Sequence, residues 1–409
     1  MLKNRLLFNK LKLFAENFKI VLLLGARQVG KSTLLSMAFP HVKNIVFDAF
    51  RDEYRVKEDP DQFLNNFPSP LILDEVQYMP ELLSSIKRHV DRNENFGQYF
   101  LTGSQNINMV KTIAESMSGR VGIMQLSGMT HFEINNYATK SWLQKYLEDP
   151  NNILNSIDIQ HRLPIYQTLW RGTLPGILKI DPLLTTDFYA SYVQTYIERD
   201  VRMLENIRDL SLFDRFLGIA AALTAQEINQ HQLGREIGLS PSTSGRWLEL
   251  LKNSYLWLET FPYFGNTVKR ISKKRKGYFF DTGLACYLQR VPSAEALSRH
   301  PLLGALFESY CVNMIMTLAQ SLPVAPRFYH WRSNSSAEVD LILDYNGCLY
   351  PIEIKCKTIL NKRDNSGIQA FRATYPNLAI AKGIILYDGD IIQNLDHNTI
   401  MMPWFAVSK

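Results

Sequence analysis

Cysteine is scarce in this sequence of 409 residues, and its spacing excludes two classes of protein. Only four cysteines occur, and no two of them form a Cys-x-x-Cys pair: Cys286, Cys311, Cys348 and Cys356. Structural zinc sites and the disulfide frameworks of small secreted domains need paired cysteines at short spacing. We therefore expect free cysteines that pack as small apolar residues.

Long apolar runs are also missing, although 46% of the residues are hydrophobic. No run approaches the roughly 18 residues that a membrane-spanning helix needs. The first residues, Met1–Leu7, lack the apolar segment and the small-residue cleavage site of a signal peptide. We therefore expect a cytoplasmic protein with no membrane partner, and a chain of this length predicts several hydrophobic cores.

Charge of one sign is not in large excess, because the formal net charge is +6. The distribution is uneven, since residues 210–290 hold 11 Lys and Arg against 6 Asp and Glu. The positive charge is therefore concentrated in one segment, which favours an acidic partner there.

A phosphate-binding loop follows the apolar run of residues 20–24 and precedes a helical pattern. Its glycines let backbone N–H groups curl around an anion, Lys31 can reach the outer phosphate oxygens, and the Ser32 hydroxyl can ligand Mg²⁺. The sequence therefore predicts that ATP and Mg²⁺ bind at nine consecutive residues: Gly25, Ala26, Arg27, Gln28, Val29, Gly30, Lys31, Ser32 and Thr33.

Two carboxylates end the apolar run of residues 71–73, as in a Walker B strand. Asp74 is expected to hold the Mg²⁺ shell, and Glu75 to polarise the attacking water as a catalytic residue. The run that ends in Leu101-Thr102-Gly103-Ser104-Gln105 is expected to lie between the other two strands. Ser104 or Gln105 can then contact the γ-phosphate or the water, or the segment is an ordinary polar turn.

Arg120 offers a cation that can neutralise charge in the transition state, either in its own chain or from a neighbouring subunit. Short apolar runs separated by helical stretches predict a doubly wound parallel sheet. These runs are residues 20–24, 43–48, 71–74, 98–102 and 121–126.

Three of these segments together resemble the AAA-type ATPase family of bacteria and archaea: residues 25–32, 73–77 and 101–104. Residues 196–201, 278–284 and 304–308 also look like segments of that family, so the resemblance spans nearly the whole chain. The resemblance implies ATP hydrolysis, and a C-terminal region of unknown function. It also implies a homo-oligomer as one option, because such ATPases often assemble through an arginine that acts in trans.

Residues 232–251 predict a helix, a tight turn and a second helix, with an apolar core at Leu233, Ile237, Leu239, Trp247, Leu248 and Leu251. A winged helix-turn-helix would add strands at 255–260 and 276–280. The expected DNA contacts are the exposed start of the second helix and the basic loop: Ser242, Thr243, Ser244, Arg246, Lys269, Arg270, Lys273, Lys274, Arg275 and Lys276. The alternative is a protein-docking winged helix with a solvated basic loop.

A carboxylate and lysine pattern near the C-terminus resembles the PD-(D/E)xK nuclease superfamily, although the Pro-Asp dipeptide is missing. Asp340 lies on one expected strand, and Glu353 and Lys355 share a face of the next. Glu308, in a helix expected over residues 302–320, can complete the set. The pattern predicts catalytic Asp340, Glu353 and Lys355 with Mg²⁺ on Glu308, Asp340 and Glu353, or an inherited scaffold that does not cleave.

Together these patterns predict an α/β multidomain chain. Its parts are a P-loop AAA-type ATPase domain over residues 1–138, a helical lid or connector over 139–209, a winged helix-turn-helix over 210–295 and a restriction-endonuclease-like α/β domain over 296–409.

The leading hypothesis is an ATPase whose nucleotide state controls DNA binding and, in one version, DNA cleavage. The rivals are a regulatory ATP switch that docks a protein partner and a ring-forming motor.

Overall fold

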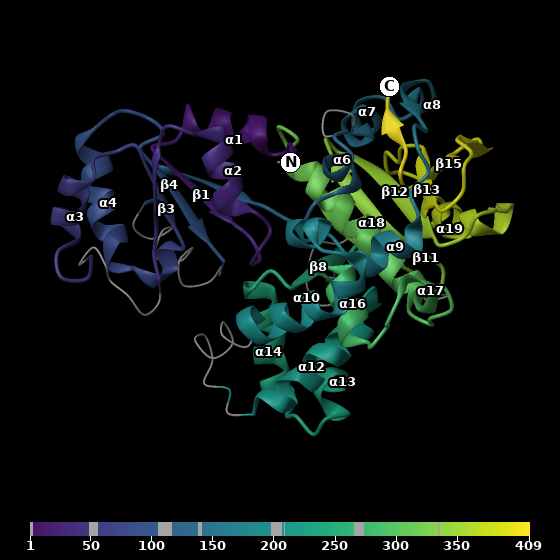
Figure 1. Cartoon of the computed structure of the whole chain (residues 1–409). Coiled ribbons are helices and arrows are strands. Elements are labelled where there is room, and N and C mark those ends of the chain that lie inside the picture. The colour runs from purple at the N-terminus through teal and green to yellow at the C-terminus, as the bar shows by residue number, and fades with distance from the viewer. Residues whose placement is uncertain are drawn as a thin grey trace. The chain divides into compact units, whose positions relative to one another are not determined.

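The computed structural model describes residues 3–48, 56–104, 117–137, 141–197, 207, 209–265, 274–333 and 336–409 (Figure 1). The chain forms two compact units, one of residues 1–129 with 251–256 and one of residues 130–250 with 257–409. Among the helices in these ranges, none is long and apolar enough to cross a membrane.

Five short strands form the parallel sheet of the first unit, in the order β2-β3-β4-β1-β5. β4 lies between β1 and β3, as the sequence predicts. Every residue of β1, β3 and β4 is buried, as central strands of such a sheet require. The strands are β1 (Ile20–Leu24), β2 (Lys43–Val46), β3 (Leu71–Asp74), β4 (Tyr99–Gly103) and β5 (Val121–Gln125).

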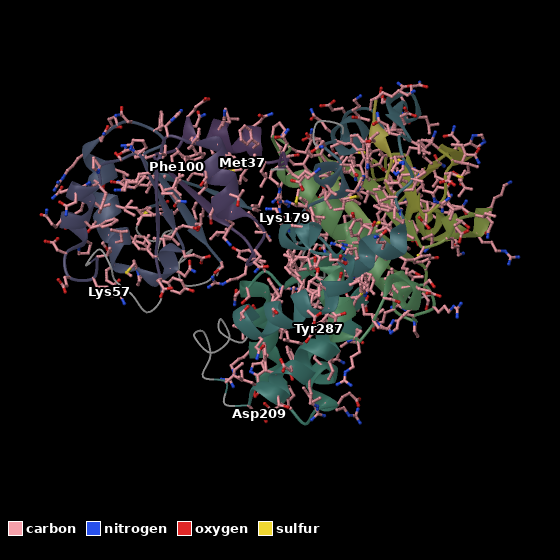
Figure 2. The ribbon with its side chains drawn as sticks, viewed as in Figure 1. Met37, Lys57, Phe100, Lys179, Asp209 and Tyr287 are labelled. Carbon is pink, nitrogen blue, oxygen red and sulfur yellow. The ribbon has the colours of Figure 1, made fainter. Side chains whose placement is uncertain are left out.

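The helices of the first unit alternate with these strands. Asp59 caps one of them, because its side chain accepts a hydrogen bond from the Gln62 N–H at 2.8 Å. Phe100 lies on β4 in the first unit (Figure 2). Its ring stacks on that of Phe39, with centroids 4.1 Å apart. The helices are α1 (Phe8–Ala15), α2 (Lys31–Ala38), α3 (Pro60–Asn66), the single turn η1 (Val76–Tyr78) and α4 (Glu81–Arg92).

Nine strands form one mixed sheet in the second unit, in the order β14-β15-β13-β12-β11-β10-β8-β9-β7. β8 and β10 pair in parallel, with Phe261 beside Tyr329, so the strands before residue 296 and those after it share this sheet. The domain boundaries expected from the sequence stay a prediction. The strands are β7 (Gln226–Glu227), β8 (Trp257–Pro262), β9 (Lys276–Phe279), β10 (Arg327–Arg332), β11 (Glu338–Tyr345), β12 (Cys348–Lys355), β13 (Gly383–Tyr387), β14 (Gln393–Asp396) and β15 (Thr399–Pro403).

The connector region is mostly helical, as expected. Its elements are α6 (His131–Ile134), α7 (Trp142–Glu148), α8 (Ile153–Ser156), α9 (Ile165–Arg171), η2 (Pro175–Lys179), η3 (Pro182–Leu184), α10 (Thr185–Tyr192) and the π-helical turn η4 (Val193–Ile197). A small antiparallel pair, β6 (Ile157–Asp158) with β16 (Val407–Ser408), ties this region to the C-terminal residues.

The other helices of the second unit pack around the mixed sheet. The longest of those described, α18 (Leu303–Gln320), corresponds to the helix expected over residues 302–320 and packs against β12 and β9 (Figure 1). The rest are α12 (Leu210–Ala222), α13 (Gln230–Arg235), α14 (Pro241–Asn253), α16 (Thr282–Leu288), α17 (Ala294–Leu297), η5 (Lys362–Asn365) and α19 (Ser366–Thr374). All four cysteines are free thiols; Cys286 and Cys311 are buried, and Cys348 and Cys356 are half-buried.

Aromatic packing holds α12 against α14. The Trp247 ring meets Phe213 and Phe216 edge-on, with centroids 5.3 and 5.4 Å apart. Trp247, Leu233 and Leu248 are buried as predicted, whereas Ile237 and Leu239 are half-buried.

A buried carboxylate joins the connector to α16. One oxygen of Asp281, Oδ2, accepts from the Thr173 N–H at 2.6 Å and the Thr173 hydroxyl at 2.7 Å. Its other oxygen, Oδ1, accepts from the Tyr189 hydroxyl and the Leu284 N–H, both at 2.8 Å. The carboxylate therefore caps α16 and fixes two segments of the connector.

A histidine ring is packed among aromatic side chains at α6. The His131 ring centroid lies 3.9 Å from that of Phe132 and 5.3 Å from that of Trp404. Burial lowers the pKa of His131 to about 3, so the ring is neutral in the fold at neutral pH.

Candidate functional site

The loop after β1 has a backbone that demands glycine at its first position. Gly25 has a φ of +151°, and a Cβ added there would lie 2.2 Å from the carbonyl oxygen of Leu126. Gly30, with a φ of +93°, directly precedes α2. These glycines let the chain turn tightly between strand and helix, so the N-terminus of α2 faces the loop.

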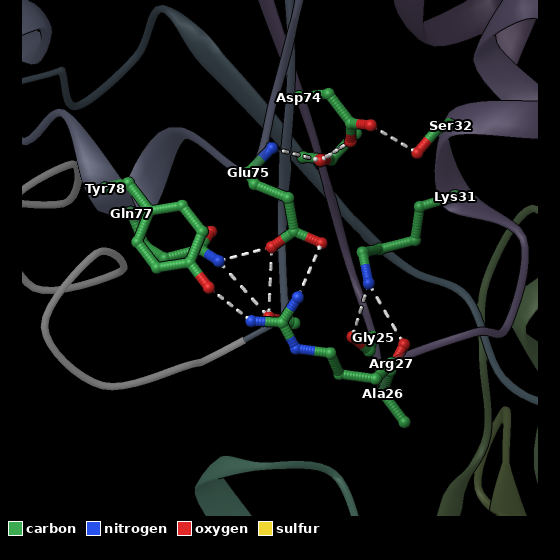
Figure 3. A network of polar contacts seen from close by, with 11 residues as sticks. Gly25, Ala26, Arg27, Lys31, Ser32, Asp74, Glu75, Gln77 and Tyr78 are labelled. Carbon is green, nitrogen blue, oxygen red and sulfur yellow. Dashed lines mark hydrogen bonds and ion pairs between the residues drawn. The ribbon is translucent and has the colours of Figure 1, made fainter. Parts of the chain in front are cut away.

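Lys31, the first residue of α2, is buried and folds back over the loop. Its Nζ donates hydrogen bonds to the carbonyl oxygens of Gly25 at 2.9 Å and Ala26 at 3.0 Å (Figure 3). An ammonium held over a glycine-rich turn is placed to meet the outer oxygens of nucleotide phosphates. The other predicted loop residues lie in the same turn or directly after it, with Val29 buried and Gln28 and Thr33 exposed.

An oxygen cluster lies beside this loop, where Mg²⁺ is predicted. The Ser32 hydroxyl donates to Asp74 Oδ2 at 2.5 Å, and the Thr102 hydroxyl donates to Asp74 Oδ1 (Figure 3). Hydroxyl and carboxylate oxygens are the ligands that Mg²⁺ takes together with waters and phosphate oxygens, so Ser32 and Asp74 fit the ion. Thr102 is a site residue that was not predicted, although its place on the strand expected between β1 and β3 was a signal for it.

Glu75 stands at a sharp turn after β3, with a φ of +57°. Its N–H donates to the Thr102 hydroxyl at 2.9 Å, and its Oε2 accepts from the Ser104 hydroxyl at 3.1 Å and from the Gln77 amide. Burial alone would raise the pKa of Glu75, but the charges of Lys31 and Arg27 and these side-chain hydrogen bonds outweigh burial and lower it. Glu75 is therefore an ionised acceptor held in place, as the base that orients a water must be.

Arg27 links the loop to the turn that follows Glu75. Its Nη1 lies 3.4 Å from Glu75 Oε1, and its Nη2 donates to the Tyr78 hydroxyl at 2.5 Å (Figure 3). The Arg27 and Glu75 side chains are 12% and 18% exposed, so this ion pair is largely shielded from water. The sequence placed Arg27 in the loop but did not indicate that its side chain reaches Glu75.

The structure separates Arg120 from the loop of its own chain. Its carbonyl accepts from the Ile20 N–H, so it precedes β5 at the amino end of the sheet, whereas Gly25 follows the carboxyl end of β1. The Arg120 guanidinium pairs with Asp91. The prediction that Arg120 contacts nucleotide bound to its own chain is therefore wrong. Its action on the nucleotide of a neighbouring subunit stays a prediction. Gln105 lies outside the described residues.

At the start of α14 the predicted DNA contacts divide into two groups. Ser242 and Arg246 are exposed and Thr243 is half-buried. Ser244 is fully buried, its hydroxyl donates to the Ser240 carbonyl at 3.1 Å, and a Cβ on Gly234 would lie 1.9 Å from its oxygen. Ser244 therefore packs at the crossing of α13 and α14, and its predicted contact with nucleic acid is corrected.

The basic segment before β9 also divides. Lys269, Arg270 and Lys273 lie outside the described residues, and Lys274 is exposed. Arg275 pairs with Glu259 at 3.0 Å, and its guanidinium lies 4.3 Å from the centroid of the Phe261 ring. Arg275 is thus engaged with the sheet, although its side chain is 41% exposed.

The C-terminal residues expected on adjacent strands do come together. β11 and β12 pair with Leu341 opposite Ile352, and Asp340 Oδ2 accepts from the Ile354 N–H at 2.9 Å. Lys355 donates to Glu353 Oε1, while Glu353 Oε2 is buried and has no hydrogen-bond partner among the residues that the structure describes.

A lysine from β9 enters the same cluster, a contact that the sequence pattern does not predict. Lys276 Nζ lies 2.6 Å from Glu308 Oε1 and 3.2 Å from Asp340 Oδ1. Lys276 is therefore a buried partner of carboxylates, and its predicted contact with DNA is corrected. Among the described residues no three His, Cys, Asp or Glu side chains are arranged to hold a metal ion, so Glu308, Asp340 and Glu353 do not form the predicted Mg²⁺ site here.

Burial and charge act against each other in this cluster. Burial alone would lower the pKa of Lys276, but the charge of Glu308, with those of Tyr278 and Asp340, raises it well above its ordinary value. Burial and the Asp340 charge raise the pKa of Glu353. Burial and the charge of Asp340 likewise raise the pKa of Glu308 to about 8. Lys276 is thus a firm cation, whereas Glu308 and Glu353 resist ionisation.

Comparison with known proteins supports the first unit directly. Residues 17–135 match the model of an AAA domain. This match agrees with the parallel sheet and the loop geometry above, so residues 17–135 are similar to an AAA domain. Residues 163–295 and 303–406 match two domains of unknown function, DUF8612 and DUF4143.

Two curated relatives align along most of the chain. They are uncharacterized proteins Rv2008c of Mycobacterium tuberculosis and Mb2031c of Mycobacterium bovis, each 27% identical over 387 residues, which cover 94% of this chain and 80% of the relative.

Similar solved structures are more distant. The Walker-type ATPase PABY2304 of Pyrococcus abyssi is 17% identical, with 69% of this chain and 94% of that chain covered and a TM-score of 0.42. The RuvB Holliday junction branch migration motor of Thermotoga maritima is 14% identical, with 62% and 88% covered and a TM-score of 0.25. Both TM-scores are too low to establish a common fold.

Proposed function

We propose that this protein is a Mg²⁺-dependent ATPase. The observation that carries the proposal is the convergence of the Lys31 ammonium, the Ser32 and Asp74 oxygens and the ionised Glu75 carboxylate beside one glycine-rich loop. An ammonium for phosphate oxygens, oxygen ligands for Mg²⁺ and a base for water are the parts that phosphoryl transfer to water needs.

Each residue of this set has a distinct task. When ATP binds, Lys31 exchanges the carbonyls of Gly25 and Ala26 for outer phosphate oxygens. Ser32 and Asp74 would hold Mg²⁺, and the ion would supply positive charge to neutralise the phosphates. Glu75 orients the water and accepts its proton, and Ser104, which already contacts Glu75, helps to hold that geometry.

Nucleotide affinity of a Lys31→Ala variant tests this proposal. Removal of the ammonium should weaken binding of a fluorescent ATP analogue by about 10-fold or more, a loss of roughly 1.4 kcal/mol. Lys19→Ala is the matched control, because Lys19 donates to the Val90 carbonyl at 3.0 Å and pairs with Glu94, away from the loop. Equal affinity of the Lys31 variant and the wild type would refute the assigned role.

We further propose DNA as the partner of the second unit. The order α12, β7, α13, α14, β8, β9 is the order of a winged helix-turn-helix, and Ser242 and Arg246 are exposed where α14 begins. Lys274 adds an exposed cation just before β9. The competing function is a switch that docks a protein partner through the same elements.

Salt dependence of DNA affinity separates these two functions. Each phosphate contact removed from duplex DNA should flatten the log-log salt slope by about 0.9, so Arg246→Ala with Lys274→Ala should flatten it by about 1.8. Lys179→Ala is the control, because Lys179 is exposed in η2, outside the helix-turn-helix elements. If the wild-type protein is not retained on a DNA column at low salt, DNA binding is contradicted and docking of a protein partner is the function that remains.

We also propose that ATP binding changes DNA affinity and that Arg120 serves a neighbouring subunit in a homo-oligomer. DNA affinity measured with and without a non-hydrolysable ATP analogue tests the coupling. Light scattering of wild type and Arg120→Ala with ATP tests the assembly, since equal masses would exclude an arginine contact in trans. The Lys276 ammonium, which contacts both Glu308 and Asp340, argues against DNA cleavage by this protein.

A further inference from the structure

Lys276 brings a cation into the carboxylate cluster from a different part of the chain. Glu308 comes from α18, Asp340 from β11 and Glu353 from β12, whereas Lys276 is the first residue of β9. The Lys276 side chain is 8% exposed, and those of Glu308 and Asp340 are 14% and 4% exposed. The Lys276 ammonium therefore interacts with both carboxyl groups with little screening by water.

The Lys276 ammonium lies where a divalent ion would bridge two carboxylates. Its Nζ is 2.6 Å from Glu308 Oε1 and 3.2 Å from Asp340 Oδ1. The second oxygen of Asp340 accepts from the Ile354 N–H at 2.9 Å. Mg²⁺ would need these oxygens at about 2.1 Å, and two cations cannot share the space between them.

The strand backbone fixes this lysine in the cluster. β9 pairs antiparallel with β8, with Lys276 opposite Thr260. Two residues further on the same face of β9, the Tyr278 hydroxyl donates to the Asp340 carbonyl at 3.4 Å. The backbone of Lys276 is therefore held by the ladder of its own strand, and the Lys276 and Tyr278 side chains both reach Asp340.

Hydrated metal ions can reach this cluster from the solvent, so a closed surface is not what would keep them out. A cavity of about 420 Å³ adjoins the cluster, and Lys276, Glu308, Lys274 and Arg332 are among its lining residues. A water molecule occupies about 30 Å³ in the liquid, so hydrated ions can reach this point.

We propose that the Lys276 ammonium is the resident cation of this cluster, and that it takes the place of the divalent metal which the Asp340, Glu353 and Lys355 pattern implies. In this arrangement the cluster binds β9 to β11 and α18. The cluster then has no divalent metal with which to activate water. The C-terminal part of the chain would therefore contact DNA without cutting it. This inference goes beyond the proposed ATPase and does not depend on it.

Metal counting on Lys276→Met tests the proposal. Methionine keeps the length and apolar stem of lysine but removes the ammonium, so the freed carboxylates should bind about one additional Mn²⁺ ion per chain. Free Mn²⁺ is measured by electron paramagnetic resonance, without nucleotide. Lys274→Met is the matched control, because it makes the same replacement at an exposed position that lines the same cavity. It should bind as many ions as the wild type.

Two further variants locate the new ion. Asp340→Asn added to Lys276→Met should remove it, and Lys276→Arg, which keeps a cation, should not gain it. The melting temperature of Lys276→Met should also rise with Mn²⁺, because an ion that binds only the folded state stabilises it.

The wild type provides a test even if Lys276→Met does not fold with or without Mn²⁺. Equal Mn²⁺ binding by the wild type and Asp340→Asn supports the proposal. An ion bound by the wild type and lost in Asp340→Asn, or Mn²⁺-dependent DNA cleavage lost in that variant, would overturn it. A folded Lys276→Met that gains no ion would also overturn it.

Discussion

Replacement of Glu75 by glutamine is the sharpest test of the nucleotide site, because the change leaves the size of the side chain intact. The amide oxygen can still accept from Ser104 and Gln77, which now meet Glu75 Oε2. What the variant loses is the negative charge, and with it the ability to take a proton from water.

Glu75→Gln should lower the rate of ATP hydrolysis but not the affinity for ATP. General-base catalysis contributes about 10²- to 10⁴-fold, so kcat should fall by that factor, or about 3–5 kcal/mol of barrier. The variant also loses the ion pair with Arg27, at 3.4 Å and largely shielded from water, and this loss lowers the stability of the fold without changing the proton transfer itself. Lys31, Ser32 and Asp74 keep the contacts described above, so ATP affinity should be equal or slightly higher.

Phosphate release gives kcat, and titration with a fluorescent ATP analogue gives the dissociation constant. Glu94→Gln is the matched control, because its side chain is 93% exposed and pairs with Lys19. An unchanged kcat in Glu75→Gln would refute the assigned role. A parallel loss of affinity and kcat would show instead that Glu75 supports the loop.

Three further predictions concern buried polar groups. Thr102→Val should cost about 1–3 kcal/mol of unfolding free energy, because the Glu75 N–H loses its acceptor, and should weaken Mg²⁺-dependent ATP binding in a Mg²⁺ titration. Asp281→Asn should cost about 3 kcal/mol in denaturant unfolding, because an amide cannot accept the four hydrogen bonds that Asp281 accepts, whereas Asp187→Asn at an exposed position should cost little. The pKa of His131 is lowered to about 3 in the fold, so as the pH falls the unfolded state takes up a proton before the folded state does. The free energy of unfolding should therefore decrease as the pH falls. From pH 7 to pH 5 the loss should be about 2 kcal/mol, and a His131→Phe variant that keeps the whole loss would contradict this cause.

The sequence predicted the first unit well because its signals are local. Apolar runs and a glycine-rich turn are set by neighbouring residues, and the parallel sheet places the ends of β1 and β3 together. The position of Arg120 could not be predicted from the sequence, because only the strand register shows that it lies at the end of the sheet opposite to the phosphate-binding loop.

The corrections in the second unit arise from contacts between residues far apart in the sequence. In the sequence, Lys276 is one of several basic residues in an expected loop. In the structure it belongs to β9, and its side chain reaches Glu308 on α18 and Asp340 on β11, although β8 and β10 lie between β9 and β11 in the sheet. Ser244 reads as an exposed cap, yet the small Gly234 allows its hydroxyl to be covered. Neither outcome follows from composition or periodicity, because both depend on which elements pack together.

The parallel pair of β8 and β10 has a consequence for how this protein can be divided. A fragment that stops before residue 296 would retain β8 but lose β10, and the edge of β8 would be open to pairing with other chains. A fragment that begins there would open the edge of β10 in the same way. The two halves of the nine-stranded sheet should therefore be expressed, purified and crystallised as one piece, and deletions made at this position should be judged by aggregation as well as by activity.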